Sequence, residues 1–353
     1  MFRNITPEKA IAFTRMSVAP AVFLPLSSQT TKLLTTGYKV FKILVLLNSF
    51  LFLLPLINAL YTYNDPANVS ESICFLLAEV QFIVNTIISI THYDRFQGVV
   101  EGMQTYCKNA NVRERVILQW YVDQFSTFYG VSATWFYLTA ILVILGTFFS
   151  SHPFPTNAVY PIAVDYQPLM SIVFLHQSVI GLQFSATVCV SVLCALLLLF
   201  ASARFEILKM ELREVKKPSE LIKCMEKYYT VRRYACDVVN TIKYLPMCTV
   251  IMCGVILVFC GIKIIQPQPF TSRCQYLSIV WTALVDVFVC AWPADHLLSI
   301  SQNVMEGIYE STWFDRGSSM QRDVRIMLLP QPPVAIKVDC IIPALSLNYF
   351  CSV

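Results

Sequence analysis

Charged side chains are scarce in this sequence. Asp, Glu, Lys and Arg make up 14% of the 353 residues, whereas hydrophobic residues make up 56%. Soluble globular domains carry about 25% charged residues, so the composition argues against an ordinary soluble domain and indicates a polytopic membrane protein. The formal net charge is only +4 and comes from loops on one side of the predicted spans. It therefore gives the orientation of the chain, and we expect no nucleic-acid partner.

The patterns typical of catalytic and metal sites are also missing. The 13 cysteines include no C-x-x-C pair, and the four His residues show no Cys/His spacing of the zinc type. There is no glycine loop that would cradle phosphates and no G-x-S-x-G elbow. We therefore expect no enzyme, no metal and no cofactor. Most cysteines lie in apolar runs as small buried hydrophobes, while Cys74 and Cys274, near predicted outer helix ends, leave one outer disulfide as an alternative.

Long apolar runs dominate the chain instead. About 20 apolar residues span a bilayer as a helix, and six segments meet this length: roughly 40–62, 72–92, 126–149, 171–203, 244–265 and 275–298. The fourth exceeds the minimum and must tilt or continue beyond the membrane. The apolar piece Val18–Leu26 contains two prolines and is too short to cross, so it is interpreted as re-entrant or interfacial. The predicted fold class is an all-α polytopic membrane helix bundle with six full spans.

The chain divides at changes in hydropathy. Residues 1–38 form a cytoplasmic N-terminal segment, 39–203 hold transmembrane helices one to four, 204–243 form a cytoplasmic helical loop, and 244–298 hold helices five and six. Residues 299–353 are predicted to be a cytoplasmic helical anchor and the incomplete start of a seventh helix. Helical spacing of apolar residues from Phe205 to Val215 predicts that the fourth helix continues into the cytoplasm, with a break at Pro218 and a second amphipathic helix to about Lys243.

Loops that are rich in Lys and Arg alternate along the chain with loops that have none or few. The segment up to Lys42 carries six, the loop 93–125 four and the loop 204–243 ten, whereas 63–71 and 150–170 carry none. The positive-inside rule therefore predicts a cytoplasmic N-terminus. The sequon at Asn68 then lies in an outer loop and is a candidate for glycosylation, whereas the sequon at Asn4 would be cytoplasmic. The loop 150–170 is rich in Pro and aromatic residues and is predicted to be an ordered outer cap.

A few polar side chains interrupt the spans. A charge at the centre of a membrane helix costs roughly 2.5–3.5 kcal/mol on insertion scales. Asp286 in the sixth span is therefore either a gating residue or a hydrogen-bonded packing residue, and Glu79 in the second span either faces a ligand or a solvated vestibule. In the fourth span, Gln177 and Phe184 either orient a small apolar ligand or pack between helices.

Several short segments, most of them near or after the end of the sixth span, resemble those of a known family. The block Trp292–Leu297, the run from Glu306 to Trp313 and the pairs Phe154-Pro155 and Tyr160-Pro161 resemble the insect odorant receptors, and the likeness extends over nearly the whole chain. The Pro-Ala-Asp form within Trp292–Leu297 is similar to receptors of ants, bees and wasps. The stretch Arg325–Leu328 with Gln331-Pro332-Pro333 resembles the entry of the family's seventh helix.

The resemblance implies a plasma-membrane, multi-pass subunit of a ligand-gated cation channel in olfactory sensory neurons. In that family an odorant-binding subunit assembles with a co-receptor subunit as a heterotetramer, the cytoplasmic ends of helices four to seven anchor the subunits, and the seventh helix lines the pore. Membrane lipid and a small volatile ligand are the other expected partners. Only three residues follow the segment 345–350, which resembles the start of the pore-lining helix, so we expect that helix to be missing from this sequence.

The resemblance places the ligand in the outer half of the bundle, among helices two, three, four and six. The candidate ligand-binding residues are Glu79, Phe82, Trp135, Tyr137, Phe174, Gln177, Ile180, Phe184, Tyr276 and Trp281. The candidate subunit-anchor residues are Tyr309, Trp313 and Arg325. Two alternatives remain open: a gustatory receptor of the same superfamily, and a G-protein-coupled receptor, which would need its N-terminus outside.

Overall fold

The structure is a computed structural model of the full chain. It describes residues 5–63, 65–149, 154–164, 166–267, 270–315, 317–329, 331–337, 344–347 and 351. Every regular element within these ranges is a helix. Asn4 of the first sequon and Asn348–Phe350 of the predicted seventh helix lie outside the described residues, so the predictions made for them stay untested.

Six of the described helices are long and apolar enough to cross a membrane. They are α2 (Lys32–Thr62), α3 (Pro66–Thr91), α5 (Val112–Gly146), α6 (Leu169–Arg213), α8 (Tyr244–Ile265) and α9 (Phe270–Asn303). The prediction of an all-helical bundle with six spans is confirmed. Several helices extend beyond the apolar runs: α5 begins 14 residues before 126 because Asn111 and Glu114 form a capping box there, and α9 continues through Pro293.

The remaining helices are shorter or more polar. They are α1 (Pro7–Ser17), α4 (Tyr93–Asn109), α7 (Pro218–Ile242), α10 (Glu306–Tyr309) and α11 (Ser318–Met327), with 3₁₀ turns at Ala19–Ala21 (η1), Thr147–Phe149 (η2) and Trp313–Asp315 (η3). The predicted helix break is present, because α6 ends at Arg213 and α7 begins at Pro218. Proline at the first helical position lacks the N–H that a helix start leaves unpaired, which explains why the new helix begins there.

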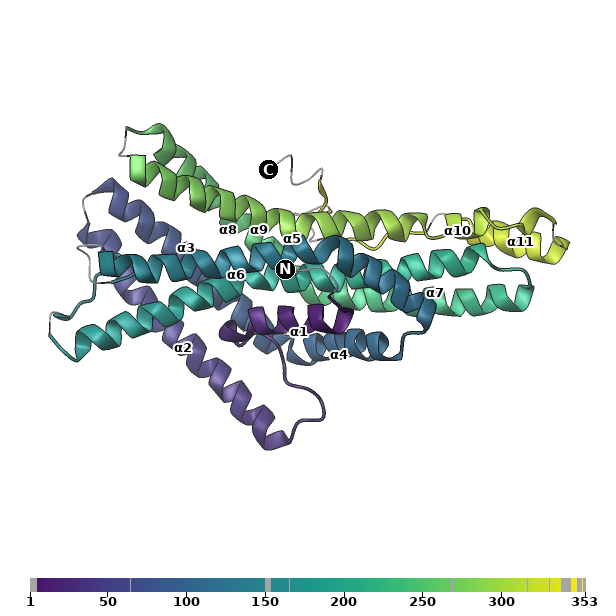
Figure 1. Ribbon diagram of the computed structural model, residues 1–353, viewed down its shortest axis with the longest axis horizontal. Helices are drawn as coiled ribbons and strands as arrows, with labels where there is room; N and C mark the ends of the chain where they lie inside the picture. Colours follow the sequence, from purple (N-terminus) through teal and green to yellow (C-terminus); the bar gives the residue numbers. More distant parts are fainter. Residues whose placement is uncertain are drawn as a thin grey trace.

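The helix α6 occupies the centre of the bundle (Figure 1). In its most apolar stretch 83% of the residues are buried, compared with at most 44% in any other described span. It contacts α5, α7, α9 and α10. Small residues along it, among them Ala186, Ala195 and Ala201, have no exposed surface, and small side chains allow membrane helices to approach closely. The other spans therefore pack around α6.

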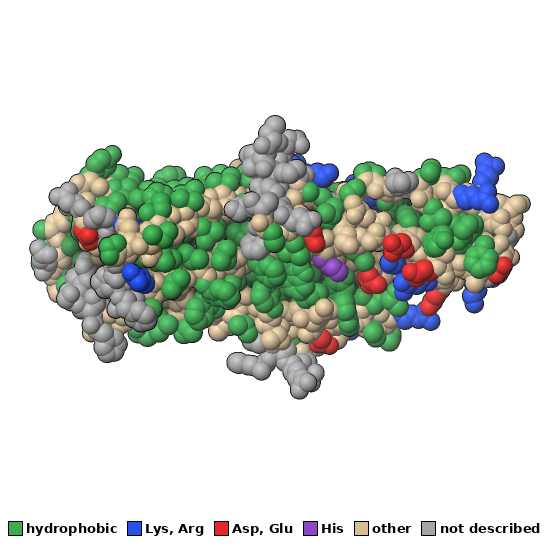
Figure 2. Space-filling view, turned by 90° about the horizontal axis from the view of Figure 1, so that it is seen from above, with side chains coloured by type: hydrophobic (Ala, Val, Ile, Leu, Met, Phe, Trp, Pro, Cys, Tyr) green, Lys and Arg blue, Asp and Glu red, His purple; other side chains and the backbone are tan. Residues whose placement is uncertain are grey.

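Hydrophobic and charged side chains separate along the long axis. Apolar side chains cover most of the surface over the end that holds α2, α3 and α8, whereas Lys, Arg, Asp and Glu gather at the opposite end around α7, α10 and α11 (Figures 1 and 2). Leu44, Leu51 and Leu54 on α2 are each more than half exposed. An apolar surface of this kind suits contact with lipid chains, so the chain is a multi-pass membrane protein.

The N-terminal segment packs into the bundle. Val18, Phe23 and their neighbours are buried, and the ammonium Nζ of Lys42 donates to the carbonyl oxygen of Phe23 at 2.8 Å and to the Ser89 hydroxyl at 2.6 Å. Buried charges are tolerated when such hydrogen bonds replace water. The described residues 5–31 are thus helix α1, which packs against α4, α5 and α6, and a turn that hydrogen-bonds to α2. The assignment of the apolar piece as re-entrant or interfacial stays a prediction.

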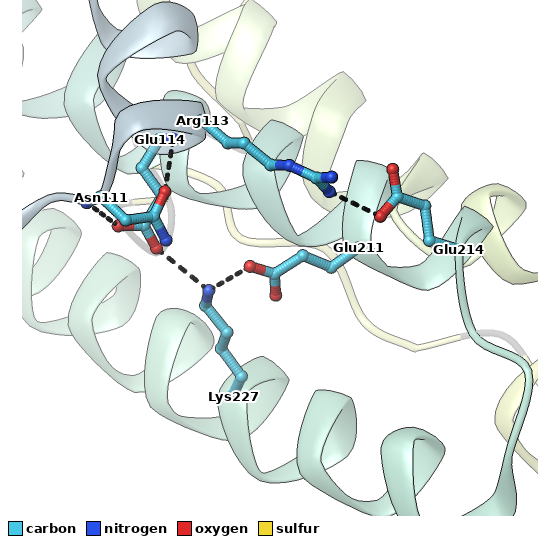
Figure 3. Close-up of polar contacts among 6 residues, drawn as sticks. All are labelled: Asn111, Arg113, Glu114, Glu211, Glu214 and Lys227. Carbon is cyan, nitrogen blue, oxygen red and sulfur yellow. Dashed lines mark hydrogen bonds and ion pairs between the residues drawn. The ribbon is translucent and has the colours of Figure 1, made fainter.

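Ion pairs join the helices at the charged end. The Lys227 ammonium on α7 lies 3.2 Å from Glu114 on α5 and 2.6 Å from Glu211 on α6 (Figure 3). On the rim, Arg113 pairs with Glu214 at 2.8 Å. The Lys227 triad is only partly exposed, so solvent screens it less than the rim pair. It therefore ties three helices together where the spans leave the apolar part of the bundle.

Two predictions at the ends of the spans need correction. Asn68 does not lie in a loop, because α3 begins at Pro66 and places it in the first helical turn, half-buried and accepting a hydrogen bond from Asn157 at 3.4 Å. Glycosylation there stays a prediction. Cys74 and Cys274 are both free thiols. The thiol of Cys74 instead interacts with that of Cys260 on α8, because the sequence alone did not show which side of α3 faces α8.

The contact between α10 and α6 depends on a glycine. A Cβ atom at Gly307 would lie 2.3 Å from the carbonyl oxygen of Lys209. Backbone atoms cannot move aside as a side chain does, so any larger residue must push α10 away from α6.

We predict that Gly307→Ala destabilises the folded protein by roughly 1–3 kcal/mol, the range typical of overpacking. Thermal unfolding of the purified protein, followed by fluorescence, measures the change. The matched control is Gly98→Ala on α4, where no atom lies within 4 Å of the added Cβ. Equal unfolding temperatures for the two variants would contradict the proposed close contact.

Candidate functional site

A cavity of about 220 Å³ lies between α5 and α6, and we call it the α5–α6 cavity. The described segment 154–164 closes one side, and α3 and α9 each contribute one residue. Its lining residues are Phe75, Phe136, Thr139, Ala140, Val143, Ile144, Pro155, Thr156, Gln177, Gly181, Phe184, Ser185, Val188 and Thr282.

The two long walls follow helical periodicity. Phe136, Ala140 and Val143 recur along α5, and Gln177, Gly181, Ser185 and Val188 recur along α6, at steps of three and four residues. Each set therefore lies on one face of its helix. At Gly181 an added Cβ would meet only the Cδ1 atom of Ile144, at 3.9 Å. The absence of a side chain at this position leaves space in the wall.

Gln177 holds the segment 154–164 over the cavity. Its side-chain carbonyl oxygen accepts hydrogen bonds from the backbone N–H and from the hydroxyl of Thr156, both at 3.0 Å. Its amide nitrogen donates to the Tyr160 hydroxyl at 3.4 Å, and burial raises the pKa of that phenol, so Tyr160 stays neutral. Farther along, the Asn58 amide donates to the carbonyl oxygen of Val159 at 3.0 Å. The segment is an ordered cap connected to α2 and α6.

The cavity is mostly apolar, and the hydroxyls that line it already donate, that of Thr156 to Gln177 and the others to the backbone. Ser185 and Thr139 each donate to the carbonyl oxygen of Phe136 at 2.8 Å, and Thr282 donates to Ser278 at 2.9 Å. A hydroxyl oxygen that donates keeps lone pairs for accepting a hydrogen bond. No ionisable side chain is among the lining residues. This chemistry suits a small neutral ligand with an apolar body and at most one or two polar groups.

Two of the predicted ligand-binding residues line this cavity. Gln177 hydrogen-bonds to the cap. Phe184 forms part of the wall, and its ring stacks on that of Phe75 with 6.3 Å between the ring centroids. The prediction missed the remaining lining residues. Extending the helical face from Gln177 by steps of four would have found Gly181 and Ser185, so the sequence did contain a signal for them.

The other predicted residues lie elsewhere in the bundle. Ile180 is buried against Phe52 and Leu56 on another face of α6, and Phe82 is buried in the main core. Tyr137 donates its hydroxyl hydrogen to the carbonyl oxygen of Ser17. Ile180 shows the effect of helix rotation, because it shares α6 with Gln177 but contacts α2. Phe82 lies seven residues beyond the lining residue Phe75, on the same face of α3 but about two turns farther along it. The sequence left both rotation and depth undetermined.

Four aromatic candidates lie near the ends or the surface of the spans. Trp135 is 39% exposed and Trp281 is 60% exposed, so both indole rings face outward. Phe174 is half-buried and packs on Phe148, with 5.9 Å between ring centroids. Tyr276 is buried but is not among the lining residues of the α5–α6 cavity. The structure does not bring these four rings to the cavity. Phe174 shares a face of α6 with Gln177 and Gly181 but lies about one turn before them.

The two acidic residues within the spans are buried outside the cavity. Glu79 has no exposed surface, and neither carboxyl oxygen has a hydrogen-bond partner in the described part of the chain. Asp286 accepts a long hydrogen bond from the Cys253 thiol at 3.9 Å, and its other oxygen has no partner among the residues that the structure describes. The described residues contain no group of three His, Cys, Asp or Glu that could hold a metal ion.

The predicted subunit-anchor residues lie at the charged end. Tyr309 is 66% exposed and Arg325 is exposed on α11. Trp313 is half-buried and packs on the main core. Tyr309 and Arg325 are therefore accessible from outside the protomer, whereas Trp313 contributes mainly to the packing of the protomer itself.

A second cavity, of about 270 Å³, lies between α1, α4, α5 and α6. We call it the α1–α5 cavity. It lies nearer the charged end than the α5–α6 cavity, because its lining residues on α6 run from Val192 to Ala203 rather than from Gln177 to Val188. None of the predicted ligand-binding residues lines it.

Comparison with solved structures shows a close likeness of fold. An olfactory receptor of the insect Machilis hrabei, OR5, matches with a TM-score of 0.79, and the same receptor in complex with eugenol matches with 0.74. Each match covers 98% of this chain and 94% of the other, at 12% identity. No curated protein sequence matches the chain.

Sequence comparison identifies the family. A family model described as "7tm Odorant receptor" matches residues 65–353, which is more than three quarters of the chain. Five of the six described spans, the polar helices at the charged end and the cavity between α5 and α6 fall within the matched region, whereas α2 precedes it. The chain therefore belongs to the 7tm odorant receptor family.

Proposed function

We propose that this protein is an odorant receptor subunit that binds a small, volatile, neutral ligand in the α5–α6 cavity. The observation that carries the proposal is the combination of an apolar cavity of about 220 Å³ with a few placed polar groups and an ordered cap. Ligand pockets generally combine these features. The eugenol complex of Machilis hrabei OR5 supports a ligand of this class.

We further propose that ligand binding gates a cation channel formed with a co-receptor subunit. A ligand shifts a closed–open equilibrium only by its difference in affinity for the two states. The exposed Tyr309 and Arg325 at the charged end supply side chains for contacts with other subunits. Loops rich in Lys and Arg support a plasma-membrane orientation with the charged end and the N-terminus in the cytoplasm.

We predict that Gly181→Leu weakens the ligand response by filling the α5–α6 cavity. Leu suits a helix better than Gly does, and the nearest atom to the new Cβ is 3.9 Å away, so the fold should persist. Current recorded from cells that express the variant with the co-receptor should show a dose–response midpoint raised by about tenfold or more. The matched control, Gly254→Leu on α8, has no atom within 4 Å of its Cβ and should respond normally. An unchanged response of Gly181→Leu would refute this site.

We predict that Gln177→Leu loosens the cap and destabilises the protein by roughly 1–3 kcal/mol, because two donors of Thr156 lose their acceptor. Gln183 lies on the same helix and is also buried, but its side-chain oxygen accepts no hydrogen bond. Gln183→Leu should therefore leave the unfolding temperature unchanged or raise it. Thermal unfolding of both variants tests this difference, and equal losses would show that the cap does not depend on Gln177.

We predict that an epitope at the N-terminus reacts with antibody only in permeabilised cells. An epitope inserted after the exposed residue Ala163, in the cap segment, should react in intact cells. The two insertions control for each other, because both report on the same expressed protein. An N-terminal epitope that reacts in intact cells would overturn the orientation and favour the arrangement of G-protein-coupled receptors.

A further inference from the structure

The α1–α5 cavity lies beneath a helix that is attached at both ends. Before α1, the Gln119 amide on α5 donates to the carbonyl oxygen of Ile5 at 2.7 Å. At the end of α1, the Tyr137 hydroxyl donates to the carbonyl oxygen of Ser17. Between these two attachments α1 contacts α5 and α6, and the three helices together border the cavity of about 270 Å³. Hydrogen bonds at both ends of α1 therefore hold the wall of the cavity in place.

Its walls are more uniformly apolar than those of the α5–α6 cavity. Deep in the space, Phe125, Val192, Leu196 and Leu199 are among the lining side chains. Most polar groups that reach it are engaged elsewhere: the Tyr121 hydroxyl lies 2.9 Å from the His296 ring, and Thr14 donates to Ala10 at 3.0 Å. The buried Ser126 hydroxyl is the exception, since it has no hydrogen-bond partner among the described residues. An interior of this kind offers little to orient a functional group, so it suits an unbranched hydrocarbon chain.

The cavity reaches the surface beside α1. Of its lining residues on this helix, Lys9 and Phe13 are exposed. The attachment at Gln119 lies outside the apolar run 126–149 of α5, whereas the attachment at Tyr137 lies inside it. The opening with Lys9 is therefore at the depth where lipid headgroups meet the hydrocarbon region. A lysine ammonium at this depth attracts anionic headgroups.

We propose that the α1–α5 cavity holds one acyl chain of an anionic membrane lipid, with its headgroup at Lys9. The chain enters beside Phe13 and extends along Phe125 and Leu196 between α5 and α6. Glu8 and Asp123 are exposed nearby, and Asp123 accepts a hydrogen bond from Gln119 at 2.7 Å. Neither carboxylate is among the described lining residues, whereas the Lys9 ammonium is the cation among them. This site is separate from the α5–α6 cavity, so its test does not depend on a volatile ligand.

Photolabelling of the full chain in phosphatidylcholine vesicles tests the proposal. The vesicles carry a trace of lipid with a diazirine on its acyl chain, in three arms: phosphatidylserine, phosphatidylcholine and free fatty acid. Mass spectrometry should find the label on peptides covering 5–14 and 118–130, with more label from the anionic probes than from phosphatidylcholine. The phosphatidylserine and fatty-acid arms show which carrier supplies the chain. Labelling of these peptides no stronger than that of the lipid-exposed face of α2, in all three arms, would overturn the proposal.

Two matched pairs of variants sharpen the test. Ser126 lines the cavity and Thr127, the next residue on α5, is exposed outside it. Ser126→Phe should lower labelling about tenfold, which corresponds to about 1.4 kcal/mol of binding free energy, and Thr127→Phe should not. Lys9→Gln should reduce phosphatidylserine labelling to the phosphatidylcholine level, whereas Lys32→Gln on the exposed start of α2 should not. Should Ser126→Phe fail to fold, the labelling map of the unaltered protein decides the question.

Discussion

The burial of α6 along most of its length is the constraint on which the structure depends. Lipid tails are as apolar as leucine, so helices in a membrane associate through close packing rather than through the exclusion of water. α6 meets this requirement with small residues such as Ala186, Ala195 and Ala201, which have no exposed surface. Helices α5 and α9 pack directly against it, and both cavities use its side chains as a wall.

Sequence reasoning predicted the elements of the fold well, because each depends on a local property. Apolar length alone predicts the six spans, and the proline at 218 with the preceding apolar spacing predicts that α6 ends and α7 begins near that residue. The extension of α5 to Val112 was missed because residues 112–125 are too polar to count as a span. A capping box at Asn111 was the local signal for that start.

The site was less predictable, because it depends on helix rotation. Gln177 and Ile180 are three residues apart on α6, yet Gln177 faces the α5–α6 cavity and Ile180 faces α2. Apolar residues surround both positions in the sequence, so hydropathy does not distinguish the faces. The α1–α5 cavity had no sequence signal at all, because it results from two tertiary hydrogen bonds, from Gln119 and from Tyr137.

The two cavities differ in the polar atoms that stand beside their apolar walls. This difference separates the proposed ligand site from the proposed lipid site. Around the α5–α6 cavity, Gln177 and Thr156 present polar atoms near apolar walls, so a ligand with a single polar group gains orientation as well as burial. In the α1–α5 cavity the hydroxyl of Tyr121 lies against His296, and burial is the main gain offered. A polar odorant would lose hydrogen bonds to water there and would find the Ser126 hydroxyl, among the described lining residues, as an unpartnered group to replace them.

Because α6 is continuous, a displacement of this helix at the α5–α6 cavity can be transmitted to the charged end. From Gln177 to Lys209 the chain is one uninterrupted helix, about 48 Å long at 1.5 Å per residue. At its far end the carbonyl oxygen of Lys209 lies against Gly307, and the Lys209 ammonium pairs with Glu306 at 2.8 Å. A well-packed helix transmits displacement as a rigid body. Any movement of α6 at the cavity must therefore shift α10 as well, since the close contact at Gly307 leaves no room for the two helices to move independently.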